Sequence, residues 1–265
     1  MSISIACALV AFLVAPQDSA KARLDSSPRH HEWVDVKGPS RSVHCFVAFP
    51  EVKGKVPAVL VIHENKGLTD WVRSVADRLA EAGYVAIAPD LLSGKGPNGG
   101  NTDAFPSTDA ATQGIYALDP AGVMADLAAV GAHARALPAC DGKLAVAGFC
   151  WGGSQSFAFA TKQKDLAAAF VFYGGAPKEP AELATIACPV YGFYGESDAR
   201  ITSTLDATKE AMAKASKTFE PVVYAGAGHG FLRTGDEDDA SEADEKAHDE
   251  AWARWKELLG RLAKP

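Results

Sequence analysis

The stretch Lys143-Leu-Ala-Val-Ala-Gly148-Phe149-Cys150-Trp151-Gly152-Gly153 joins a run typical of a buried strand to a segment that favours a helix. A turn this sharp needs small residues on both sides of the side chain that it presents. Gly148 and Gly152 meet this need. Cys150 would also lie at a helix N-terminus, where unpaired N–H groups favour the thiolate anion. The turn therefore predicts an exposed nucleophile, with a small buried cysteine as the alternative.

An acid and a histidine follow this cysteine along the chain. Asp198 ends the run Tyr191-Gly-Phe-Tyr-Gly195-Glu-Ser-Asp198, and His229 lies in Tyr224-Ala-Gly-Ala-Gly-His229-Gly-Phe231. Nucleophile, acid, histidine is the chain order of α/β-hydrolases. Each residue comes just after an apolar run typical of a strand. All three are therefore predicted at the carboxyl edge of one sheet, where open α/β sheets bind their ligands.

Composition limits the class of protein and of partner. The 265 residues are 48% hydrophobic and 22% charged, which is ordinary for a globular protein and sufficient for one large core. The formal net charge of -7 argues against nucleic acid or an anionic membrane surface as a partner. We expect a monomer that binds a small molecule, with no nucleic-acid partner and no stable membrane anchor.

The N-terminal region has the pattern of a signal peptide. Residues 3–15 are almost entirely apolar, and this stretch is too short to span a bilayer but fits the core of a leader. Ala20-Lys21-Ala22 offers a cleavage site, so we expect a signal peptide over residues 1–22 and a single domain over 23–265. No basic side chain precedes the apolar stretch, so a wrongly assigned start or a buried N-terminal helix are alternatives. We expect an exported protein, periplasmic or secreted, with a cytoplasmic location as the alternative.

Cysteine and histidine usage predicts no disulfide, metal or cofactor. Cys45, Cys140, Cys150 and Cys188 would remain after cleavage, but a chain of this length does not need disulfides to hold its core together. Cys140 and Cys188 are expected on strands two positions apart, which exceeds the span of a disulfide. The seven histidines lack the spacing of zinc sites. Residues 30 and 31, both histidines, are interpreted as part of a solvated linker.

Strand-like and helix-like segments alternate along the rest of the chain. Residues 41–49 alternate polar and apolar side chains, as a half-buried antiparallel strand does, whereas 56–62 is a continuous apolar run typical of a strand covered on both faces. Further strands are expected at 84–88, 143–147, 167–173, 189–194 and 218–224, and helices at 68–82, 120–137, 153–161, 204–215 and the C-terminus. This order predicts an α/β three-layer sandwich with a mostly parallel twisted sheet.

Residues 91–117 are rich in Gly, Pro, Ser, Thr and Asn and are expected to form one long loop. Loops of such length in a compact domain are usually functional or disordered. The segment is interpreted as a flap or wall of the binding pocket. The alternative is a surface loop that takes no part in binding.

A carboxylate follows the strand expected at 56–62. In Val59-Leu-Val-Ile-His63-Glu64-Asn65-Lys66-Gly67-Leu68, Glu64 stands where hydrolases of this fold usually place oxyanion-hole backbone. Together with Ala88-Pro-Asp-Leu-Leu92 and the segments that carry the cysteine, the aspartate and the histidine, this stretch resembles the dienelactone hydrolase (carboxymethylenebutenolidase) family. The resemblance covers roughly residues 40–260, and it implies an α/β-hydrolase fold.

The resemblance assigns catalytic roles. It implies that Cys150 attacks an ester or lactone carbonyl, that His229 moves the proton, and that Asp198 holds the imidazole. It also implies that the backbone N–H groups of Trp151 and Asn65 form an oxyanion hole. Two such converging donors stabilise charge that appears only in the tetrahedral intermediate.

Three more residues receive roles from the same resemblance. Glu64 would pair with the resting thiol and shift when substrate arrives. Arg233 would bind a substrate carboxylate, which suits the planar guanidinium, and Phe231 would also contact substrate. A second family arginine is absent, because the chain reads Leu92-Ser-Gly-Lys95 at that point. Lys95 offers a point charge without the fork geometry, so dienelactone itself is not the predicted substrate.

Sulfur as the nucleophile restricts the substrate class. A thiolate is itself a good leaving group, so the tetrahedral intermediate reverts unless the other departing group leaves more easily. The predicted function is hydrolysis of activated carboxylic esters or lactones through an acyl-cysteine intermediate. A thioesterase, and a non-catalytic exported binding or redox-sensing protein on the same scaffold, are the alternatives.

Overall fold

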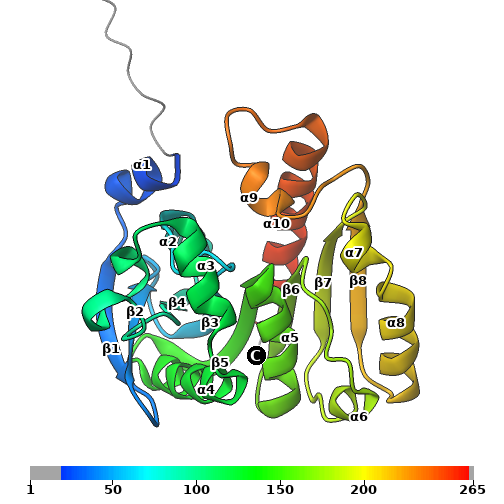
Figure 1. The fold of residues 1–265 in the computed structure, drawn as a ribbon, viewed down its shortest axis with the longest axis horizontal. Helices are drawn as coiled ribbons and strands as arrows, with labels where there is room; N and C mark the ends of the chain where they lie inside the picture. The colour runs from blue at the N-terminus through cyan, green and yellow to red at the C-terminus, as the bar shows by residue number, and fades with distance from the viewer. Residues whose placement is uncertain (1–18, 263–265) are drawn as a thin grey trace, which may run out of the picture.

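The structure is a computed structural model, and it describes residues 19–262. One eight-stranded sheet forms its centre (Figure 1). In chain order the strands are β1 (His31–Lys37), β2 (Ser42–Ala48), β3 (Val56–Ile62), β4 (Val85–Pro89), β5 (Cys140–Phe149), β6 (Ala168–Phe172), β7 (Val190–Gly195) and β8 (Phe219–Tyr224). Their spatial order is β1-β2-β4-β3-β5-β6-β7-β8. β2 pairs antiparallel with both β1 and β4, and all other neighbours are parallel.

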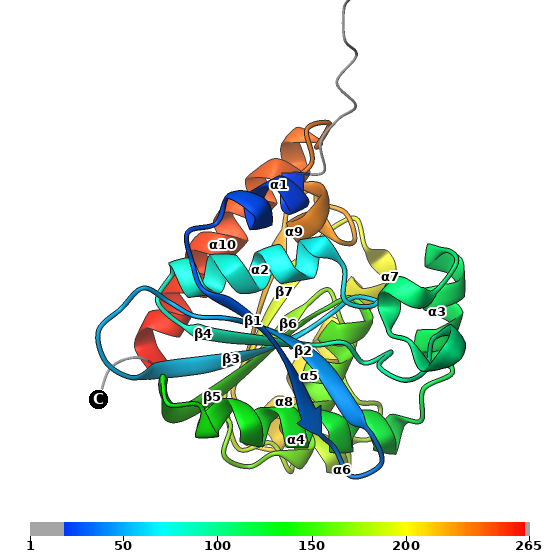
Figure 2. The same ribbon diagram turned by 90° about the vertical axis from the view of Figure 1, so that its left-hand side faces the viewer.

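Helices cover both faces of the sheet (Figure 2). They are α1 (Ser19–Ser26), α2 (Asp70–Glu81), α3 (Thr108–Tyr116), α4 (Pro120–Ala136), α5 (Trp151–Lys162), α6 (Pro180–Leu183), α7 (Ala199–Thr202), α8 (Leu205–Lys214), α9 (Phe231–Thr234) and α10 (Glu242–Leu262). α2 and α10 pack on one face, whereas α4, α5 and α8 pack on the other. The predicted three-layer α/β sandwich is confirmed.

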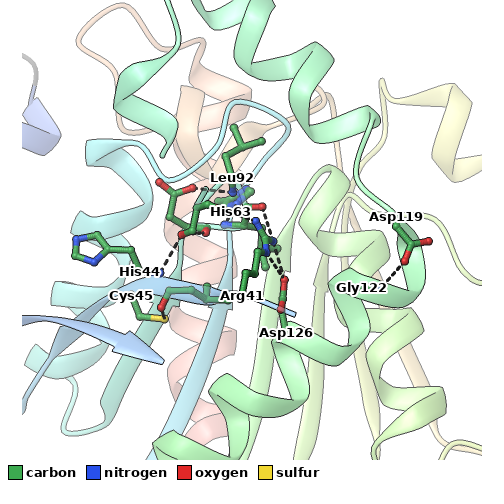
Figure 3. Close-up of polar contacts among 12 residues, drawn as sticks. Arg41, His44, Cys45, His63, Leu92, Asp119, Gly122 and Asp126 are labelled. Carbon is green, nitrogen blue, oxygen red and sulfur yellow. Dashed lines mark hydrogen bonds and ion pairs between the residues drawn. The ribbon is translucent and has the colours of Figure 1, made fainter. Parts of the chain in front are cut away.

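The central strands are apolar throughout because both of their faces are buried. In β3, Val59 and Val61 belong to the core beneath α2 and α10, and Leu60 and Ile62 belong to the core beneath α4 and α5. α4 begins where its sequence predicts, with Pro120 in the first turn. The Asp119 carboxylate accepts a hydrogen bond from the Gly122 N–H at 2.8 Å (Figure 3), which caps the helix.

The interpretation of residues 30 and 31 as a solvated linker is wrong for His31, where β1 begins, whereas His30 lies before the strand and is exposed. This edge strand is held to α2 through Asp77, whose side chain is fully buried. The Asp77 carboxylate accepts hydrogen bonds from Arg29 at 2.6 and 2.8 Å and from Ser27 at 2.5 Å, and His31 Nε2 lies 2.8 Å away. The polar composition of the segment therefore reflects a satisfied ion-pair cluster.

The stretch 91–117 is more ordered than the expected loop. It contains two short 3₁₀ turns, Pro97–Gly99 and Thr102–Ala104, and then α3. The Ser107 side chain caps α3 by accepting a hydrogen bond from the Ala110 N–H, and Ala111 and Ile115 pack on Leu92. A small satellite core thus forms a helix where the composition favoured a loop.

The predicted signal peptide lies mostly outside the described residues, which begin at residue 19. Residues 19–22 form the first half of α1, and Ala20 is buried there. Cleavage after Ala22 therefore stays a prediction. Over residues 19–262 no single helix is long and apolar enough to cross a bilayer, and α3 with α4 passes that test only as a pair bent by 98°.

Three cysteines are buried in the core as free thiols: Cys45, Cys140 and Cys188. Cys140 opens β5 and Cys188 precedes β7, and β6 lies between these two strands. The predicted separation of these two thiols is confirmed.

Candidate active site

Cys150 alone forms the turn between β5 and α5. Its φ of 55° and ψ of -115° lie in a region that residues with side chains rarely adopt. A Cβ at Gly148 would come within 2.0 Å of the Gly152 carbonyl oxygen, and a Cβ at Gly152 within 2.3 Å of the His63 carbonyl oxygen. The backbone can therefore close this turn only with glycine at both positions.

His229 and Asp198 meet beside this turn. Asp198 follows β7, His229 follows β8, and His229 Nδ1 lies 2.5 Å from Asp198 Oδ2. A hydrogen bond with the Cys150 side chain raises the pKa of His229; burial opposes this effect, and Asp198 adds to it. The structure thus brings together the three residues that the sequence predicted at the carboxyl edge of the sheet.

A pocket of about 650 Å³ opens over Cys150 and His229. Four further predicted site residues line it: Glu64, Asn65, Trp151 and Arg233. Six residues that sequence analysis did not single out also line it: Lys66, Tyr116, Ser154, Tyr173, Arg200 and Ile201. Tyr116 ends α3, so the segment predicted as a flap or wall does form part of the wall.

Glu64 is paired differently from what the family resemblance implied. Its side chain is only 8% exposed, and Arg233 Nε donates a hydrogen bond to Glu64 Oε2 at 3.1 Å. Arg233 Nη1 donates to Glu237 Oε1 at 2.6 Å. Burial raises the pKa of Glu64, and the nearby Arg233 and Lys66 oppose that rise. A buried carboxylate needs a counter-charge, and Arg233 supplies it; within residues 19–262 Glu64 forms no hydrogen bond with the Cys150 thiol.

The expectation that Phe231 contacts substrate is wrong in this structure. Phe231 is fully buried, and its ring packs against Tyr173 at 5.5 Å and against Tyr224 at 5.1 Å. Gly230 precedes it with a φ of 82°, so the chain turns back into the core directly after His229. Lys95 is exposed and is not among the residues that line the pocket.

Tyr173 is the most prominent pocket residue that the sequence analysis missed. It follows β6 with a φ of 41°, and its ring lies 5.1 Å from that of His229. Its hydroxyl is buried without a hydrogen-bond partner among residues 19–262, and burial raises its pKa well above the usual value. Tyr173 is the last residue of the core strand expected at 167–173, and a position at this edge of the sheet could have predicted it as a pocket residue.

Cationic side chains also face the pocket. Lys66 and Arg200 line it, and neither forms an ion pair with an acidic side chain in the described part of the chain. Arg200 Nη2 lies 3.4 Å from His229 Nδ1. The same residues, 19–262, contain no group of three or more His, Cys, Asp or Glu side chains placed to hold a metal ion.

Comparison with known proteins identifies the family. The model of the dienelactone hydrolase family matches residues 43–263. The chain belongs to the dienelactone hydrolase family. The recognition made from the sequence motifs is therefore confirmed, and the protein is a hydrolase of carboxylic esters or lactones.

Individual relatives agree with the dienelactone hydrolase assignment. The chain is 33% identical over 200 residues to a protein of Methylorubrum extorquens named "Putative carboxymethylenebutenolidase". The aligned region covers 71% of this chain and 68% of the relative. The chain is 30% identical to a protein of the same name from Saccharolobus solfataricus, covering 84% and 95%. The crystal structure of a "Putative Dienelactone Hydrolase" from Klebsiella pneumoniae superposes with a TM-score of 0.76 at 26% identity, covering 88% and 98%.

Proposed function

We propose that the protein hydrolyses activated carboxylic esters or lactones with Cys150 as nucleophile, His229 as general base and acid, and Asp198 as the group that holds the imidazole. One observation carries the proposal: Cys150 occupies a strained turn beside a histidine whose other nitrogen is 2.5 Å from a buried carboxylate. That arrangement is the geometric requirement for an activated nucleophile.

In the acylation step His229 takes the proton of the Cys150 thiol, the sulfur attacks the substrate carbonyl, and a tetrahedral oxyanion forms. The collapse of this intermediate breaks the bond to the alcohol or enol oxygen, which takes its proton from His229. Water then attacks the acyl-cysteine while His229 accepts a proton, and the thiolate departs. The acid product and the free enzyme result.

The oxyanion is proposed to accept hydrogen bonds from the backbone N–H groups of Asn65 and Trp151. Trp151 is the first residue of α5, so its N–H has no carbonyl partner within that helix. Both residues line the pocket with Cys150. Removal of one such donor typically costs about 10²- to 10³-fold in kcat.

The pocket favours a substrate that carries a carboxylate. Lys66 and Arg200 face it without an acidic partner in the described chain, whereas Arg233 is occupied by two carboxylates. An anionic group beside the scissile carbonyl would pair with the two unpaired cations. The binding energy would be modest for these partly exposed side chains and would weaken with added salt.

Turnover of a substrate panel tests the function. 4-Nitrophenyl acetate, the 4-nitrophenyl monoester of succinic acid, a lactone and a thioester are compared on the wild type, Cys150→Ala and His229→Ala. We expect either substitution to lower kcat/KM to below about a hundredth of the wild-type value, because the residues act as one unit. Lys66→Met should lower kcat/KM for the succinate ester and spare the acetate ester. Unchanged turnover in Cys150→Ala would end the proposal.

A further inference from the structure

His63 is a fully buried histidine between the ends of two core strands. Its Nδ1 lies 2.7 Å from the backbone oxygen of Glu64, and the backbone N–H of Leu91 donates to its Nε2 at 3.2 Å. An N–H group can only donate, so Nε2 is the acceptor and Nδ1 carries the hydrogen. Burial also lowers the pKa of His63, which favours the neutral ring. The side chain therefore donates one hydrogen bond, to the carbonyl of Glu64.

That carbonyl belongs to the peptide unit that carries the N–H of Asn65. The peptide bonds of residues 19–262 are all trans, so the C=O and the N–H of one unit point in opposite directions. When His63 holds the Glu64 oxygen, the Asn65 N–H is turned to the opposite side of the chain. Asn65 lines the pocket over Cys150, whereas His63 is not among the lining residues.

The ring of His63 is itself held on two sides. It stacks on the ring of Trp151, with centroids 5.7 Å apart and planes inclined by 15°. The Leu91 segment is fixed by Arg41, which donates to the Leu91 carbonyl at 2.9 Å and to Asp126 at 2.6 Å. Figure 3 labels His63, Arg41 and Asp126 of α4, and dashed lines join Arg41 to Asp126. Few motions of the ring are compatible with all of these contacts.

We propose that His63 is a positioning residue that orients the Asn65 N–H as an oxyanion donor. Its stacking on Trp151 also fixes the position of the Asn65 N–H relative to the Trp151 N–H, the second proposed donor. The inference rests on the proposed function. His63 touches no substrate and acts only through the peptide unit that it holds.

Three substitutions separate the hydrogen bond from the packing. His63→Asn places an amide nitrogen near the position of Nδ1 and keeps the donor. His63→Phe keeps the stacked ring and loses the donor, and His63→Gln offers a polar group near Nε2 without a donor near Nδ1. If the Phe variant does not fold, the Gln variant carries the same test.

The readouts are kcat and KM on 4-nitrophenyl acetate and the rate of alkylation of Cys150 by iodoacetamide, which forms no oxyanion. His63→Phe and His63→Gln should lower kcat by about 100-fold with KM within about threefold, as the loss of an oxyanion donor does. The alkylation rate should stay within about twofold of the wild-type rate. The kcat of His63→Asn should be at least about tenfold higher than that of His63→Phe or His63→Gln. As a matched control, His248→Phe removes another buried histidine, which lies on α10 away from the pocket, and should leave kcat unchanged.

The inference is overturned if His63→Phe and His63→Gln retain the wild-type kcat. A parallel loss of turnover and alkylation that His63→Asn does not rescue would also overturn it, because that result indicates general disruption of the site. Absence of turnover in the wild type would instead overturn the proposed function, and this inference with it.

Discussion

At the scale of single residues, two strained positions build the pocket. Cys150 and Tyr173 both have positive φ angles, which cost about 1–3 kcal/mol each in ordinary side-chain-bearing residues. The sheet holds both: the Cys150 N–H donates to the Phe172 carbonyl at 3.0 Å, and the Tyr173 N–H donates to the Phe193 carbonyl at 2.8 Å. The strain is thus offset by hydrogen bonds to neighbouring strands.

Tyr173→Phe should separate stability from activity. The hydroxyl is buried without a partner in the described chain, so its removal should raise the free energy of unfolding by about 1 kcal/mol. Tyr173 also lines the pocket, and loss of a hydrogen bond from its hydroxyl to a bound substrate should lower kcat/KM about tenfold. Urea unfolding and steady-state kinetics measure the two effects. A destabilised variant would show that the hydroxyl is hydrogen-bonded in the folded protein.

Residue roles were predictable from sequence where they depend on residue type and chain order. Cys150, Asp198 and His229 carry that signal. Phe231 was misread because its place in a motif that resembles the family, two residues after His229, does not tell which way the chain turns after Gly230. Tyr173 and His63 were missed because their positions matter through backbone geometry, which no residue type reveals.

At the scale of elements, the buried strands were easy to predict and the edges were not. β3 is apolar at every position because both faces are covered, and its bounds were predicted without error. β1 mixes acidic, basic and apolar residues because it is an edge strand that is mostly exposed. α3 was missed because only Ala111 and Ile115 of its residues are buried, which leaves little periodic signal.

The closeness of β3 and α5 makes a matched pair of glycine substitutions informative. A Cβ at Gly152 would lie 2.3 and 2.4 Å from two backbone oxygens at the end of β3, so Gly152→Ala should cost about 3 kcal/mol or more. A Cβ at Gly260, within α10, would meet nothing within 4 Å. Gly260→Ala should therefore raise the free energy of unfolding by about 0.5–1 kcal/mol. Chemical unfolding of the two variants checks the contrast, and equal effects would show that the turn can relax.

At the scale of the whole molecule, one carboxylate links the N-terminal segment to α2, in addition to the pairing of β1 with β2. Asp77 of α2 holds Ser27, Arg29 and His31, all of which lie after the predicted cleavage site. Removal of residues 1–22 would leave this cluster intact. The sequence could not predict the cluster, because its members lie about 50 residues apart along the chain.

Asp77→Asn should therefore destabilise the whole fold. The substitution leaves the guanidinium of Arg29, only 10% exposed, without its counter-charge, which should cost about 3 kcal/mol. Burial alone would raise the pKa of Asp77, but hydrogen bonds from Arg29, Ser27 and His31 lower it overall. The contribution of the carboxylate is thus present above its unfolded pKa of about 3.9 and is lost as pH falls through the lower folded value.

Unfolding free energies of the wild type and Asp77→Asn between pH 7 and pH 3 measure this effect. The difference should be constant near neutrality and shrink below about pH 4. Glu182→Gln, which breaks an exposed pair with Lys162, serves as the control and should show little change. A pH-independent difference would contradict the ionic origin of the stabilisation.

The most direct test of the account is intact mass after rapid acid quenching of the enzyme with 4-nitrophenyl acetate. The proposed mechanism predicts that one acetyl group appears on the protein within the burst phase, that peptide mapping assigns it to Cys150, and that it disappears as substrate is exhausted. His229→Ala should lower the rate at which the adduct forms. Full turnover with no adduct on Cys150 at any time, or an adduct on another residue that turns over at the same rate, would contradict the central claim.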